Sequence, residues 1–202
     1  MTPATAFLAL ELVTAVRVRD PLPGGGDAVA RTTGWSLVER RGDDLVLRAC
    51  AVTTTPVLGT TTRYPPAFVA AAPVDRATAV VDGDRFAAGP WTSVFGATDA
   101  DSDGKPGLTV QVESSLLGRG DVYVTQTSTT RLEGVVSPDG TIAGRAVVDT
   151  RQELLGATSW WLRIPTSPRP DPDASRFRLI PVGEGTCAAV AAALARPHVG
   201  TE

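Results

Sequence analysis

The chain contains very few of the residues on which common enzyme chemistry depends. Its 202 residues include one histidine, His198, one lysine, Lys105, and no asparagine. A single histidine close to the end of the chain leaves little for a Ser–His–Asp triad or a histidine metal site. The absence of asparagine excludes N-glycosylation. The codons of a GC-rich genome disfavour lysine and asparagine, and this is a simpler explanation of the arginine excess than anion recognition.

Several sequence motifs and long-range patterns are also missing. There is no run of about 18 apolar residues that would predict a membrane-spanning helix. No Walker, dinucleotide-binding or G-x-S-x-G fingerprint is present. A formal net charge of −3 gives no electrostatic reason to expect nucleic acid as a partner. These absences favour a protein that is not an enzyme, and no feature indicates an oligomeric state.

The composition is typical of one globular domain, which we expect to span residues 1–202. Hydrophobic residues make up 43% and charged residues 20% of the chain. The N-terminal segment 7–18 is apolar, but it contains Glu11 and alternates like a strand, so we do not interpret it as a signal peptide. If the protein is exported, we expect its leader to be absent from this chain.

Alternation of apolar and polar residues with a period of two predicts strands along most of the chain. Turn signals at 42–44 and 137–140 separate neighbouring strands. The segment 56–90 is less regular, and Tyr64-Pro65-Pro66 interrupts any strand there. The predicted strands are 8–18, 32–40, 45–54, 77–81, 91–95, 108–113, 122–132, 141–152 and 177–182.

Helical spacing occurs once, and it predicts a helix at about 186–196. Thr186 is a suitable N-cap, and Cys187, Val190 and Leu194 fall on one face that should pack on a sheet. Cys50 lies in the middle of a predicted strand, so a disulfide with Cys187 is geometrically sensible. Two buried free thiols are the alternative, as in many cytosolic proteins. We favour the disulfide because the threonine-rich strands are typical of an exported protein.

Antiparallel strands followed by one C-terminal helix predict a mainly β fold, a single up-and-down β-barrel of lipocalin-like architecture. A β-sandwich is the alternative. Gln126, Ser128 and Thr130 continue the face that Val122 and Val124 begin, so one end of this face is polar. A cavity or barrel mouth accepts such groups better than a dry core. A β-bulge that exchanges the two faces would explain them equally well.

The segment 99–104 has the composition of a calcium-binding loop. Asp99, Asp101 and Asp103 alternate, and Gly104 permits a sharp turn. Calcium takes six to eight oxygen ligands, and alternate residues of a tight loop point towards a common centre. We expect the three carboxylates and the backbone carbonyl of Lys105 to be ligands of a structural calcium ion.

The loop differs from an EF-hand. The twelfth position, where an EF-hand has glutamate, is Val110, and strands rather than helices flank the loop. A remote carboxylate such as Glu113, or water, would have to complete the site. An exposed acidic turn without metal is the alternative.

Several motifs carry a resemblance to a known group of proteins. They are the run 99–110, the segments 121–126 and 134–144, the segment 171–177 and the late Cys187. Together they resemble uncharacterised exported, lipoprotein-like proteins of myxobacteria and their relatives, over roughly residues 45–190. The resemblance implies export and adds no catalytic residues. Because this chain has no lipobox cysteine, it does not imply a membrane anchor.

The four tryptophans are the remaining indication of function. Core packing is the more common role for rings such as Trp35 and Trp91. Trp160 and Trp161 are adjacent, so in a strand one of them would face outward and could bind a ligand. Our candidate ligand-binding residues are Trp160, Trp161, Trp35 and Gln126.

These observations support three hypotheses of function. The first is an exported barrel that binds a small apolar or glycan ligand and carries a calcium loop. The second is a structural envelope or assembly protein with a solid barrel. A barrel isomerase or hydrolase is a less favoured third. A hollow interior would favour the first over the second.

Overall fold

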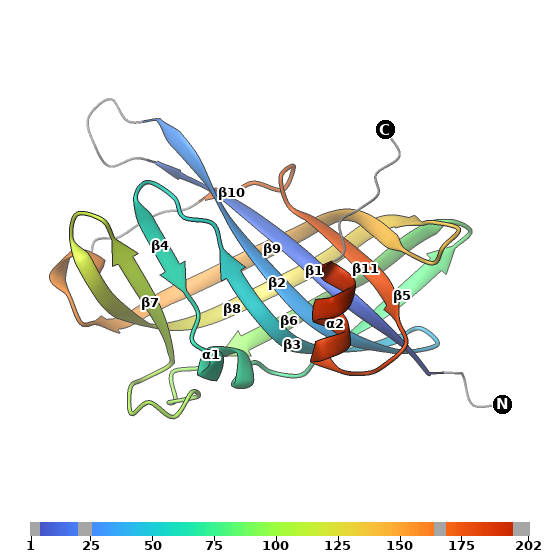
Figure 1. The fold of residues 1–202 in the computed structure, drawn as a ribbon, viewed down its shortest axis with the longest axis horizontal. Helices are drawn as coiled ribbons and strands as arrows, with labels where there is room; N and C mark the ends of the chain where they lie inside the picture. Colours follow the sequence, from blue (N-terminus) through green and yellow to red (C-terminus); the bar gives the residue numbers. More distant parts are fainter. Residues whose placement is uncertain (1–4, 20–25, 164–168, 196–202) are drawn as a thin grey trace.

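The computed structural model describes residues 5–19, 26–163 and 169–195. Within these ranges the chain is mainly strand, with two α-helices and one 3-10 turn (Figure 1). The elements are β1 (Thr5–Arg19), β2 (Asp27–Arg41), β3 (Asp44–Thr54), β4 (Thr60–Arg63), α1 (Pro66–Ala70), β5 (Asp75–Asp82), β6 (Arg85–Phe95), β7 (Leu108–Ser114), β8 (Gly118–Val136), β9 (Ile142–Ala157), η1 (Trp160–Arg163), β10 (Arg169–Pro170), β11 (Arg176–Val182) and α2 (Cys187–Leu194).

In the described part of the chain, eight strands pair into a closed ring. The order around the ring is β1, β2, β3, β5, β6, β8, β9 and β11, and β11 pairs back with β1. All these pairings are antiparallel. The order follows the chain except that β4, β7 and β10 are passed over. The predicted mainly β, antiparallel, up-and-down fold with a C-terminal helix is therefore confirmed.

Two short strands extend the sheet beyond the ring. β8 is long enough to pair with two strands along one edge: Gln126–Val135 pairs with β6, and Gly118–Val124 pairs with β7. β4 pairs with the free edge of β7. In Figure 1 this extension lies at the left of the molecule, beyond the end of β6.

The ring is less continuous between β3 and β5. These strands pair only where Asp44–Leu47 meets Asp75–Thr78. The later residues of β3 pair with β2, while α1 packs near β3 and β7. Phe68 of α1 is buried with Leu108, Val110 and Val124. The short helix therefore covers the side of the ring where the strands separate.

The C-terminal helix packs on the outer face of the ring against β1, β2 and β11 (Figure 1). Thr186 caps it by accepting a hydrogen bond from the Ala189 amide at 3.1 Å. Val190 and Leu194 are buried against Ala9 and Leu37 of the sheet. The prediction of a capped C-terminal helix with its apolar face on the sheet is confirmed.

Cys50 and Cys187 form a disulfide with a Cα–Cα separation of 5.4 Å. Cys50 lies in β3 at the point where the β2–β3 register shifts, and Cys187 is the first residue of α2. The bond attaches the helix to the outer face of the ring. The predicted disulfide is thus present.

Candidate functional site

The interior of the ring changes character along its length. One end is filled by a buried apolar cluster that includes Leu8, Val38, Phe86, Leu132 and Leu179. The other end is polar on β8, where the register with β9 is unbroken from Val124 to Val136. No face-exchanging bulge therefore interrupts this part of β8, and the strand alternation keeps its polar side chains inside.

A cavity of about 230 Å³, partly open to solvent, lies at the polar end of the ring. Its lining comes from β1, β2, β3, β5, β6, β8 and β9, and from α1 with the residues beside it. This volume corresponds to on the order of eight water molecules in the liquid. It is slightly smaller than a typical drug-sized pocket and suits a small organic molecule.

The cavity contains one carboxylate among its described lining residues, that of Asp75 at the start of β5. Ser93 Oγ donates a hydrogen bond to Asp75 Oδ2. Burial raises the pKa of the Asp75 carboxyl, and hydrogen bonds from Ser93 and Trp91 oppose part of this rise. No arginine or lysine pairs with Asp75 among the described residues. The side chain is thus a half-buried acid held by neutral donors.

Aromatic rings form a second part of the lining. Tyr64 and Phe68 have ring centroids 4.6 Å apart, and Phe68 and Phe95 have centroids 5.4 Å apart. Burial raises the pKa of the Tyr64 phenol, and a hydrogen bond with Thr32 opposes the rise. Together with Trp91, these rings give the cavity an apolar surface beside its carboxylate.

A chain of hydrogen-bonded side chains forms the third part. Gln126 donates from Nε2 to Ser128 Oγ at 3.0 Å, and Ser128 Oγ lies 3.0 Å from Thr150 Oγ1. Gln152 donates from Nε2 to Gln126 Oε1, also at 3.0 Å. Gln126, Ser128 and Thr150 line the cavity. These side chains satisfy one another's hydrogen bonds, and amide and hydroxyl groups can also form hydrogen bonds with a ligand in their place.

The sequence-based candidates for ligand contact are spread over three places. Gln126 lines the cavity. Trp35 packs outside the ring in the cluster beneath α2. Trp160 and Trp161 belong to the 3-10 turn η1 rather than to a strand, and Trp160 is largely exposed. The structure therefore does not bring these tryptophans together with Gln126, and their role as ligand contacts stays a prediction.

Asp75 and Trp91 were not among the sequence-based candidates. Trp91 was expected to pack in the core, and it does pack against the apolar cluster while also lining the cavity. Asp75 shares the inner face with Ala77 and Ala79, two and four residues later. Extending that alternation back by one step would have placed the carboxylate inside.

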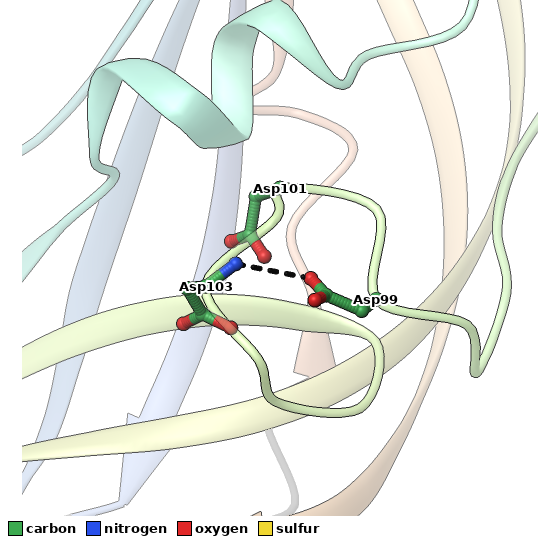
Figure 2. Close-up of side chains that lie close together, drawn as sticks. All are labelled: Asp99, Asp101 and Asp103. Atoms are coloured by element: carbon green, nitrogen blue, oxygen red, sulfur yellow. Dashed lines mark hydrogen bonds between the residues drawn. The ribbon is translucent and has the colours of Figure 1, made fainter.

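The acidic loop lies between β6 and β7 (Figure 2). Oxygen atoms of Asp99, Asp101 and Asp103 lie within 4.8 Å of one another, so the three carboxylates could hold a metal ion. The same carboxylates bind the loop's own backbone. Asp99 accepts from the amides of Asp103 at 3.2 Å and Gly104 at 2.9 Å.

Further hydrogen bonds attach the loop to the beginning of β7. The Thr109 amide donates to Asp101 Oδ2 at 3.0 Å, and the Thr109 hydroxyl donates to Asp103 Oδ2. The Asp101 Oδ1 atom is buried and has no hydrogen-bond partner among the described residues. Glu113, the suggested remote ligand, instead pairs with Arg63 and Arg119. The Lys105 carbonyl stays a predicted ligand.

Comparisons with protein-family models, curated proteins and solved structures find no match to this chain. Among the residues whose placement is described, no helix is long and apolar enough to cross a membrane. The functional argument therefore depends on the cavity and its lining.

Proposed function

We propose that this protein is an exported, non-enzymatic binding protein that encloses a small, largely apolar ligand inside its eight-stranded ring. The observation that carries the proposal is the cavity at the polar end of the ring, with aromatic and aliphatic walls and a few polar groups. Such a combination of apolar surface and a small number of convergent polar side chains is typical of small-molecule sites.

The cavity favours this function over a solid structural barrel. A scaffold whose surface alone makes contacts gains nothing from a hollow interior, because unfilled space forfeits packing energy. The small volume also favours a compact apolar molecule over an extended glycan. The Cys50–Cys187 disulfide supports export, as does the resemblance to exported myxobacterial proteins.

A cavity-filling variant tests the proposal. Gly34 lines the cavity, and a Cβ placed there would have no atom closer than Leu12 O at 4.0 Å. The first side-chain atom of Gly34→Leu therefore has room, and the rest of the leucine should occupy cavity volume. The exposed Gly96, where a Cβ meets nothing within 4 Å, provides the matched control Gly96→Leu.

Titration calorimetry with 2-phenylethanol, a small neutral probe, gives the readout. We expect wild type and Gly96→Leu to bind the probe alike, and Gly34→Leu to bind at least tenfold more weakly. Equal binding by all three proteins would contradict a ligand site at this position.

The acidic loop is proposed to hold a structural calcium ion through Asp99, Asp101 and Asp103. The close approach of the three carboxylates and the unpartnered Asp101 Oδ1 support this assignment. Calcium at a hundredfold excess over its dissociation constant should stabilise the fold by about 2.7 kcal/mol.

Thermal unfolding in calcium and in EDTA tests the ion. The triple variant Asp99→Asn, Asp101→Asn, Asp103→Asn keeps one acceptor oxygen on each side chain but loses the charges, so its melting temperature should not respond to calcium. Coincident curves for wild type in calcium and EDTA would refute the calcium assignment and leave an ion-free acidic loop.

A further inference from the structure

The charge of the cavity identifies a class of ligand. Of the described residues that line it, Asp75 is the one with a carboxylate, and none is lysine, arginine or histidine. The charge contributed by the described lining is therefore negative when Asp75 is ionised. An anionic ligand would meet repulsion with no cation to offset it.

Asp75 retains the capacity to bind a further donor. A carboxylate has about four lone-pair positions, and the partners identified for Asp75 are Ser93 and Trp91. Both are neutral donors, so they satisfy hydrogen bonds without neutralising the charge. A cationic donor from the ligand would supply the missing counter-charge and form a charge-assisted hydrogen bond.

The aromatic rings favour the same kind of ligand. Trp91 lines the cavity together with Asp75 and lowers the pKa of its carboxyl, and Tyr64, Phe68 and Phe95 share the lining. Indole, phenol and phenyl faces attract an organic cation through their quadrupoles, and they also cover its apolar body. A carboxylate beside aromatic walls is a suitable environment for an alkylammonium group.

We propose that the ligand is a small primary or secondary amine with an apolar or aromatic body, bound as its ammonium ion by Asp75. The ammonium group donates to the Asp75 carboxylate, and the body lies against Trp91 and the rings near α1. The inference rests on the proposed function, since it names the ligand class of the same cavity.

Three probes of nearly equal size separate charge from shape: 2-phenylethylamine, 2-phenylethanol and phenylacetate. Calorimetry near neutral pH should show the amine binding about tenfold or more tightly than the alcohol, and phenylacetate binding most weakly. In Asp75→Asn the amine should lose its advantage over the alcohol.

An exposed acid provides the matched control. Asp149 lies on the outer face of β9, so Asp149→Asn should keep the preference for the amine. A cooperative thermal unfolding transition shows that Asp75→Asn is folded. If Asp75→Asn does not fold, the ratio of the amine affinity to the alcohol affinity of wild type tests the inference by itself.

The outcomes distinguish this inference from the proposed function. Binding of the alcohol with equal or weaker binding of the amine overturns the amine assignment and leaves the cavity as a binding site. If the amine still binds more tightly than the alcohol in Asp75→Asn, the amine assignment is also overturned. Failure of every probe, with wild type and Gly34→Leu behaving alike, overturns the proposed function itself.

Discussion

Asp75 carries a charge that its surroundings support poorly. Burial raises the pKa of its carboxyl above the ordinary value, and its identified partners, Ser93 and Trp91, are neutral. Ionisation of this group therefore costs folding free energy that a charged partner would recover. Asp75 has the properties of a ligand-binding group rather than those of a stabilising one.

This cost predicts a pH dependence of stability. Below the pKa of an unfolded aspartate, about 3.9, the carboxyl is protonated in both states. As the pH rises from there through the higher pKa of the folded state, the unfolded chain loses its proton first, so the contribution to stability falls. Above the folded-state pKa the loss is complete.

Thermal unfolding of wild type and Asp75→Asn across this range provides the measurement. The two should have similar melting temperatures at the acidic end, and Asp75→Asn should become the more stable protein as the pH rises. Asp149→Asn is the control, since it removes an exposed carboxylate from the outer face of β9. Equal melting temperatures of wild type and Asp75→Asn at neutral pH would contradict the burial of the Asp75 charge.

A second residue-scale feature is the close contact of β8 and β9 at Gly134 and Gly144. The two glycines are paired, and a Cβ on Gly144 would lie 2.1 Å from Glu133 O, while one on Gly134 would lie 2.4 Å from Ala143 O. Backbone atoms cannot move aside as a flexible side chain can. The strands approach this closely only because both residues lack a Cβ.

Gly144→Ala should therefore destabilise the protein by about 1–3 kcal/mol, the range for overpacking. Denaturant unfolding measures the change. Gly96→Ala provides the comparison, because a Cβ there meets nothing within 4 Å, and it should change stability by less than about 0.5 kcal/mol. Equal effects of the two substitutions would refute the close contact.

At the scale of elements, α2 is attached to the ring by the disulfide and by a small apolar face. Val190 and Leu194 supply the buried side chains of the helix. The disulfide closes a loop of 137 residues. In the chain-entropy account, a loop of this length contributes about 5 kcal/mol to stability.

The double variant Cys50→Ser, Cys187→Ser should lose this amount in denaturant unfolding. Because α2 packs on the outer face, the folded variant should bind 2-phenylethanol as wild type does. Mass spectrometry without reductant should find wild type two hydrogens lighter than the reduced chain. Free thiols in the purified protein would contradict the disulfide and weaken the proposal of export.

The elements also show which parts of the structure are readable from sequence. Period-two alternation identified the strands of the ring, because each strand has one face towards a shared interior. The capped helix α2 was predicted from Thr186 and its apolar spacing. The polar end of the ring was anticipated from Gln126, Ser128 and Thr130, although a bulge explained them equally well until the register was known.

Other parts were not readable for physical reasons. β4 and α1 lie in the irregular segment 56–73, where prolines interrupt periodicity and the helix is only one turn long. Asp75 precedes the predicted strand 77–81, so its face could be assigned only by extending the alternation of that strand back by one step. Its proximity to Trp91 and Ser93 depends on a pairing between distant segments, which local sequence does not specify.

At the scale of the whole molecule, the ring is uneven in strength. In the described part of the chain, β1 and β2 pair along their whole lengths, from Thr5 opposite Arg41 to Arg19 opposite Asp27. In contrast, β3 and β5 pair only where Asp44–Leu47 meets Asp75–Thr78. Local opening should begin where fewest backbone hydrogen bonds and apolar contacts must break. Within the described strands, three junctions of the ring have only four residue pairs each: β3 with β5, β5 with β6, and β9 with β11. Opening should begin among these, and β5, which adjoins the cavity, takes part in two of them.

Native-state hydrogen exchange tests this uneven strength. Amides of β5 should exchange faster than those in the middle of β1 and β2, by a factor of about ten or more. Ligand bound in the cavity should slow exchange in β5 more than in β1, because Asp75 lies in β5. Uniform protection around the ring would argue against a weak junction.

The central claim is that the ring is hollow at its polar end and binds its ligand there. Methyl NMR during titration with 2-phenylethanol tests it most directly, since Leu12, Val52 and Val148 line the cavity and Val80, Val135 and Val147 are exposed. The account predicts that resonances of the first three methyl-bearing residues shift with saturation, while those of the exposed valines do not. Shifts confined to exposed residues, or an absence of shifts, would contradict it.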